Sequence, residues 1–104
     1  MAQEFLTVKN EAGITALSKQ VFDSVVKNTL EEAKGIVYDK SDSSIYQCKF
    51  INNELKILMN LTIRYGEEVT KTCEKLQMQL YDNIYDMTSI KCNDINIRIS
   101  GFRF

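Results

Sequence analysis

A long stretch of alternating apolar residues just past the middle of this chain limits the folds that it can adopt. Within residues 55–65, every second residue from position 55 to position 63 is apolar: Leu55, Ile57, Met59, Leu61 and Ile63. Successive side chains of a β-strand point to opposite faces, so the pattern predicts a strand with one buried face. A sheet built around such a strand needs a second layer of apolar side chains to cover that face.

Two amphipathic segments can supply this second layer, because their apolar residues recur every three or four positions. The first predicted helix covers residues 18–34, with Ser18 as N-cap and Gly35 at the left-handed position that often follows a helix. The second covers residues 67–87. Its apolar stripe consists of Val69, Cys73, Leu76, Leu80, Ile84 and Met87.

Shorter segments complete the predicted sheet. Residues 5–9, 45–50 and 95–100 have the composition of strands, and Asn52 and Asn53 suit a tight hairpin turn. Residues 14–17 fit either a strand or the start of the first helix, and residues 39–44 form a polar loop. The order β-α-β-β-α-β predicts an α+β fold. We expect residues 1–104 to form one domain, a two-layer sandwich with both helices on one face of a mostly antiparallel four-stranded sheet.

Several short motifs, taken in order and spacing, add a resemblance to a known family. Gly13-Ile14-Thr15-Ala16-Leu17-Ser18 precedes the first helix, which ends in Glu32-Ala33-Lys34-Gly35-Ile36. The long strand ends in Thr62-Ile63-Arg64-Tyr65-Gly66, and the last strand lies in Asp94-Ile95-Asn96-Ile97-Arg98-Ile99-Ser100-Gly101-Phe102. Over nearly its whole length the chain resembles the alkaline shock protein family of bacterial envelope stress proteins. It departs from the family at Lys19-Gln20, where Pro-Glu is common.

The resemblance implies a function without catalysis. Proteins of this family look like cytoplasmic domains that self-associate or dock to membrane-anchored partners near the cell envelope, and the family offers no agreed catalytic residues. We therefore expect a non-catalytic, cytoplasmic interaction domain without a cofactor. Its expected partner is another protein or further copies of itself, and an anchor protein would link it to the membrane.

The composition separately argues against an enzyme. The chain has no histidine, which excludes Ser-His-Asp and Cys-His arrangements and removes the commonest general base and metal ligand. With 13 basic and 14 acidic residues, no strong overall field attracts nucleic acid or an anionic membrane. The apolar runs fall far short of the ~20 residues that span a bilayer, and no secretory signal opens the sequence.

The cysteines do not have the spacing of a metal site. Cys48 and Cys73 fall on apolar faces and are expected in the core, whereas Cys92 lies in a predicted loop and is the one candidate for a reactive thiol.

The strongest candidate site lies on the second helix, opposite its apolar stripe. Met78, Tyr81 and Tyr85 project from that side, and methionine and tyrosine are enriched at the centres of protein interfaces. Either these are scattered surface side chains or they form a contact face for a partner. Asp82 and Asp86, one turn apart, are interpreted as a solvated face rather than a metal or acid–base site.

A second candidate is the sheet face turned away from the helices. Strand alternation places Lys49, Lys56, Arg64 and Arg98 on it. A basic face could bind an acidic protein or nucleic acid, but the pattern offers no aromatic side chain on which a base could stack. A solubilising face is the favoured interpretation, and nucleic-acid binding is the alternative function.

Overall fold

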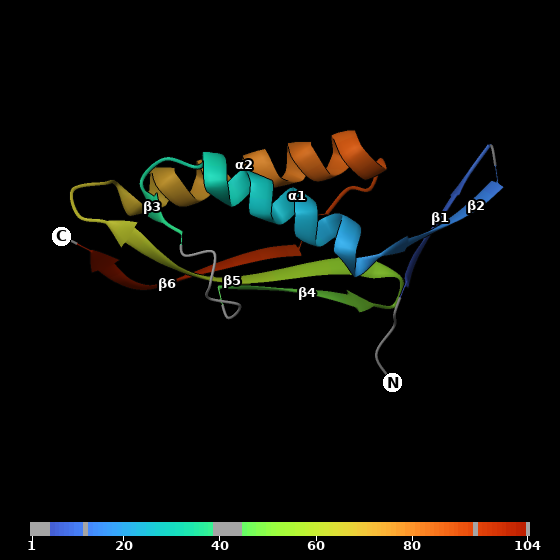
Figure 1. Ribbon diagram of the computed structural model, residues 1–104, viewed down its shortest axis with the longest axis horizontal. Helices are drawn as coiled ribbons and strands as arrows, with labels where there is room; N and C mark the ends of the chain where they lie inside the picture. The colour runs from blue at the N-terminus through green and yellow to red at the C-terminus, as the bar shows by residue number, and fades with distance from the viewer. Residues whose placement is uncertain (1–4, 12, 39–44, 93, 104) are drawn as a thin grey trace.

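The computed structural model describes residues 5–11, 13–38, 45–92 and 94–103 (Figure 1). The expected polar loop at residues 39–44 lies outside the described residues. Along the chain the elements are β1 (Phe5–Asn10), β2 (Gly13–Ser18), α1 (Lys19–Glu32), β3 (Ile36–Val37), β4 (Tyr46–Ile51), β5 (Glu54–Arg64), α2 (Val69–Thr88) and β6 (Asp94–Arg103).

The long strand β5 organises a four-stranded sheet. β4 pairs antiparallel with residues 54–59 of β5, and the short β3 pairs antiparallel with Thr62 and Ile63. β6 runs parallel to β5, with a register shift between Leu61 and Thr62. Two of the three pairings are therefore antiparallel, and β5 is paired along nearly its whole length.

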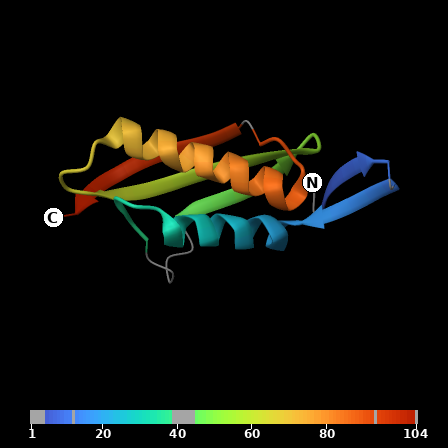
Figure 2. The same cartoon turned by 90° about the horizontal axis from the view of Figure 1, so that it is seen from above.

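Both helices cover the same face of this sheet, as Figures 1 and 2 show. All five alternating apolar residues of β5 point toward the helices and are at most 3% exposed. Phe22 of α1 meets Phe50 of β4 edge to face, with ring centroids 5.5 Å apart. Asn83 of α2 donates a hydrogen bond from Nδ2 to Oγ1 of Thr29 in α1, at 2.9 Å. The predicted two-layer α+β fold is thus confirmed.

The helix boundaries lie within two residues of those expected. Ser18 occupies the N-cap position of α1, but its side chain makes no capping hydrogen bond. Gly35 has a φ of +81°, as expected for a left-handed residue after the helix. A Cβ atom there would lie 3.0 Å from Cγ of Glu67, but that side chain is exposed and can move, so the positive φ is what favours glycine.

The first strand differs from the prediction, because it does not join the main sheet. Among the described residues β1 pairs only with β2, forming a hairpin that extends beyond the end of the two layers (Figure 1). Residues 14–17, which fitted either a strand or a helix, belong to the strand β2. The side chain of Asn53, in the β4–β5 turn, holds the hairpin by accepting from Thr7 N at 2.8 Å and donating to Thr7 O at 3.0 Å.

Candidate functional site

The outer side of α2 carries the residues singled out from the sequence. We call Met78, Tyr81 and Tyr85 the α2 ridge. Met78 is 70% exposed and Tyr85 is 45% exposed, whereas Tyr81 is half-buried. The three residues lie on the side of the helix away from Leu76, Leu80 and Ile84, which are fully buried against the sheet and α1.

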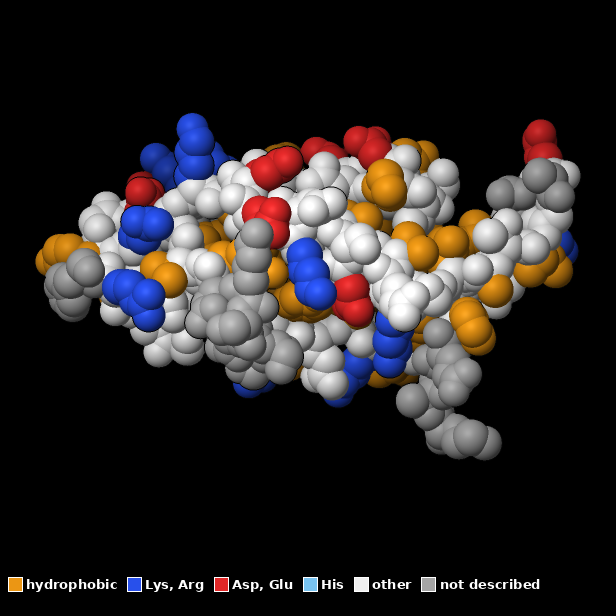
Figure 3. Space-filling model, viewed as in Figure 1, with side chains coloured by type: hydrophobic (Ala, Val, Ile, Leu, Met, Phe, Trp, Pro, Cys, Tyr) orange, Lys and Arg blue, Asp and Glu red, His pale blue; other side chains and the backbone are white. Residues whose placement is uncertain are grey.

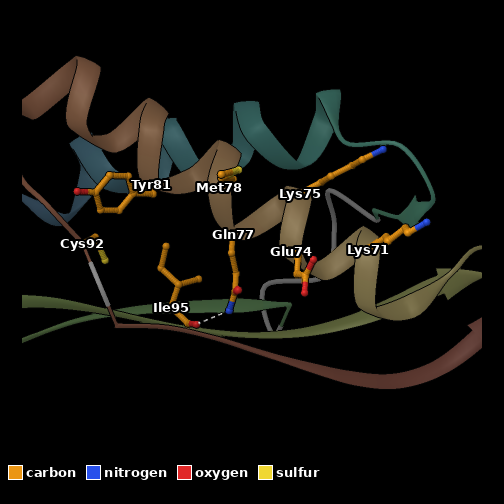
Figure 4. A pocket seen from close by; sticks show the side chains of 8 residues that line it. All are labelled: Lys71, Glu74, Lys75, Gln77, Met78, Tyr81, Cys92 and Ile95. Carbon is orange, nitrogen blue, oxygen red and sulfur yellow. Dashed lines mark hydrogen bonds between the residues drawn. The ribbon is translucent and has the colours of Figure 1, made fainter.

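A groove of about 550 Å³ runs beside this ridge, between α2 and the start of β6 (Figure 4). Its lining consists of Lys71, Glu74, Lys75, Gln77, Met78, Tyr81, Cys92 and Ile95. Gln77 reaches across it and donates a hydrogen bond from Nε2 to the backbone oxygen of Ile95, at 3.0 Å. Met78 and Tyr81 therefore share one hollow with Ile95, but Tyr85 does not line it.

The sequence did not reveal the contribution of β6 to this groove. Ile95, Ile97 and Ile99 face the helices, yet each is only partly buried, because β6 lies at the edge of the sheet. Within the described residues β6 pairs with β5 alone, so its other backbone edge faces outward beside the groove. The alternation of the three isoleucines was visible in the sequence. That they are only partly buried could not be read from it, because this depends on the order of the strands in the sheet.

Cys92 corrects one expectation, since it is buried rather than reactive. Its side chain is 2% exposed and its Sγ lies 3.4 Å from the backbone oxygen of Leu55. Burial raises the pKa of the Cys92 thiol, which disfavours the reactive thiolate form. Cys48 is buried as predicted. Cys73, also expected in the core, is only half-buried and is the most exposed of the three.

The basic sheet face has the predicted orientation but is not one cluster. All four side chains point away from the helices, because they alternate along their strands with the residues that face the helices. They are Lys49, Lys56, Arg64 and Arg98. Lys49 and Lys56 are cross-strand neighbours, and Lys56 Nζ lies 3.1 Å from Oδ2 of Asp94. Arg64 is eight residues farther along β5 than Lys56, a separation of roughly 26 Å in a strand.

The basic side chains are spread along this face, with uncharged residues between them on β5. These are Leu58, Asn60 and Thr62, and Arg98 pairs with Asn60 from β6. In the part of the sheet that the structure describes, no aromatic side chain lies on this face. The described part of this face therefore offers no aromatic ring on which a base could stack.

Asp82 and Asp86 are exposed on α2, on the side away from the sheet. Among the described residues, no three histidine, cysteine, aspartate or glutamate side chains converge in a way that could hold a metal ion.

No described helix is long and apolar enough to cross a membrane.

Comparison with known proteins gives a family match, and it covers the part of the chain that contains this site. No curated protein and no solved structure matches the chain. The model of the Asp23 family, described as having a cell envelope-related function, matches residues 46–104. That span includes β4, β5, α2 and β6, and with them the α2 ridge and the groove. Since the match covers more than half of the sequence, the chain belongs to the Asp23 family, the alkaline shock proteins.

Proposed function

We propose that this chain is a non-catalytic protein-interaction domain in a cell envelope process, which self-associates or docks to a membrane-anchored partner from the cytoplasmic side. The observation that carries the proposal is the exposed apolar rim of the groove between α2 and β6. Met78 and Tyr81 stand on this rim, next to the outward backbone edge of β6. The envelope-related role of the Asp23 family supports the cellular setting.

The energetics favour a contact at this rim. Met78 is 70% exposed, so covering its side chain would stabilise a complex by about 1–2 kcal/mol. Methionine adapts its shape to a partner, and tyrosine provides a large apolar ring with a polar tip. The charged residues Lys71, Glu74 and Lys75 line one end of the groove, beside its apolar part (Figure 4), so a partner could bind both apolar and charged groups there.

The thiols also agree with a role that involves no catalysis. A cysteine nucleophile acts as the thiolate, which needs a lowered pKa. Here burial raises the pKa of Cys48, Cys73 and Cys92 alike. Together with the lack of histidine, this leaves the chain without an activated nucleophile of the usual cysteine or serine types.

The test compares two replacements that add one negative charge each. Met78→Glu puts the charge on the ridge, and Gln47→Glu puts it on the exposed sheet face on the other side of the molecule. Met78 is preferred to the half-buried Tyr81 because its replacement should leave the fold intact. Association is measured by light scattering after size-exclusion chromatography and by recovery of binding partners from solubilised bacterial membranes.

We expect the wild-type protein to exceed the 12.0 kDa of the monomer as its concentration rises, or to retain a membrane-anchored partner. Met78→Glu should weaken that association about tenfold or more, while Gln47→Glu should not change it. Equal association by both variants would contradict the choice of surface. A wild-type chain that neither self-associates nor retains any partner would contradict the proposed function.

A further inference from the structure

The outer face of α2 has its charges segregated along the helix. On the groove side of the helix, the first half also carries the exposed acidic residue Glu74. On the outer face, Lys71 and Lys75 lie in the first half, Asp82 and Asp86 in the second, and all four are exposed. With 3.6 residues per turn, these four residues and Met78 fall within about 80° around the helix axis. Figure 3 shows blue side chains over the beginning of α2 and red side chains farther along the same upper edge.

This order of charges opposes the stability of an isolated helix. The macrodipole favours acidic side chains near the N-terminus and basic ones near the C-terminus, but Lys71 lies in the first turn and Asp86 in the last. Lys71 and Lys75 are four residues apart, as are Asp82 and Asp86, so each pair places like charges next to each other.

The rest of the described structure does little to neutralise these charges. Lys71 pairs with Glu68 at 3.4 Å, but both side chains are largely exposed and such pairs contribute little. Within the described residues, Lys75, Asp82 and Asp86 have no ion pair. The pattern thus leaves opposite charges available at the two halves of a single exposed face.

We infer that the occupant of this face is a second copy of the chain, bound as a symmetric dimer through antiparallel α2 helices. This inference rests on the proposed function and specifies its partner. An antiparallel pair centred between Met78 and Gln79 places Lys71 opposite Asp86 of the second copy, and Lys75 opposite Asp82 of the second copy. A two-fold axis repeats both contacts, since the same surface is used by each protomer.

The same centre brings the two Met78 side chains together. Met78 lies midway between the basic and acidic halves, so the most exposed apolar residue of the ridge would be covered at the middle of the interface. A parallel pair would instead set lysine against lysine and aspartate against aspartate, which like-charge repulsion disfavours. Charge complementarity therefore selects both a second copy and its direction.

A charge-swap experiment on the full chain tests the inference. One variant, Lys71→Glu with Lys75→Glu, makes the face acidic, and another, Asp82→Lys with Asp86→Lys, makes it basic. The control, Lys27→Glu with Lys49→Glu, has the same charge change as the first variant but on exposed positions of α1 and β4. Mass is measured by light scattering, and folding of each variant by circular dichroism.

We expect the wild type and the control to approach twice the 12.0 kDa monomer mass at high concentration. The acidic and basic variants should each dimerise at least about tenfold more weakly, and their equimolar mixture should recover the dimer. The recovered dimer cannot come from a misfolded chain, so it separates lost charge complementarity from lost structure.

Two results would overturn the inference. If both single-sign variants dimerise like the wild type, self-association uses another surface, and the proposed interaction function remains while this geometry fails. If the wild type stays monomeric at every concentration, the second copy is not the partner. Recovery of a membrane-anchored protein would then still satisfy the proposed function.

Discussion

At the scale of single residues, the three cysteines show how burial controls chemistry. Cys48 and Cys92 are buried, while Cys73 is half-buried on the sheet-facing part of α2. We expect a disulfide reagent at about pH 8 to modify Cys73 first, and to modify Cys48 and Cys92 only after unfolding. Mass spectrometry of labelled peptides, with and without denaturant, checks this order. Rapid modification of Cys92 in the folded chain would contradict the burial described here.

The Cys48 thiol also makes stability depend on alkaline pH. Burial, followed by the negative carboxylate of the Asp23 side chain, raises the pKa of Cys48 from 9.0 to about 12. The unfolded chain therefore loses this proton at lower pH than the folded chain. The contribution to stability is complete below pH 9 and is lost as the pH rises toward 12.

We therefore expect the free energy of unfolding to fall by on the order of 1 kcal/mol, from this thiol, between about pH 8 and about pH 10.5. Urea unfolding at both pH values measures the fall. Cys48→Ala should be less stable than the wild type at about pH 8 but should lose less stability at the higher pH. An identical loss in both proteins would show that Cys48 is not the group responsible. Tyr46, whose pKa burial raises to about 12, contributes in the same direction in both.

At the scale of elements, α2 combines a structural face with a functional one. Leu80 is fully buried in the stripe that packs on the sheet, whereas Met78, two residues earlier, is 70% exposed. Leu80→Ala should lower the free energy of unfolding by about 2–5 kcal/mol, and Met78→Ala should change it by less than about 0.5 kcal/mol. Urea unfolding of the two variants at a concentration that keeps the chain monomeric provides the comparison. A large cost at Met78 would mean that this residue supports the fold.

The elements with long periodic patterns were predictable, and the short or context-dependent ones were not. β5, α1 and α2 were found because many residues repeat one period. β2 was ambiguous because the four residues from Ile14 to Leu17 are too few to distinguish the spacing of a strand from that of a helix. The direction of β6 is not encoded in its own alternation. It follows from the crossover β5–α2–β6, a connection that places neighbouring strands parallel.

The candidate site was predictable in part for the same reason. Helical spacing identified Met78 and Tyr81 as outward-facing on α2. Their proximity to Ile95 and Cys92 depends on where β6 sits at the edge of the sheet, which is a long-range property. Alternation likewise placed the four basic residues on one sheet face, but only the strand register showed that Asp94 pairs with Lys56.

At the scale of the whole molecule, the β1–β2 hairpin is distinct from the two packed layers. A two-stranded hairpin is at most marginally stable alone, so its order depends on the contacts at its base. Leu6 is buried in the core, and Asn53 makes two hydrogen bonds to the backbone of Thr7. Amide hydrogens of the hairpin should therefore exchange faster than those of β5, which is paired on both edges.

Asn53→Gly isolates the contribution of the side chain to this anchoring. Asn53 has a φ of +60°, which glycine adopts without strain, so the variant keeps the turn but loses both hydrogen bonds. With each bond contributing about 0.5–1.5 kcal/mol, exchange at Thr7 and its hairpin neighbours should accelerate about tenfold or more. Asn52→Gly is the matched control, because Asn52 also has a positive φ, +52°, in the same turn but makes no bond to Thr7. If both variants leave hairpin exchange unchanged while β5 stays protected, the hairpin must be ordered by Leu6 and its apolar neighbours instead of by the asparagine.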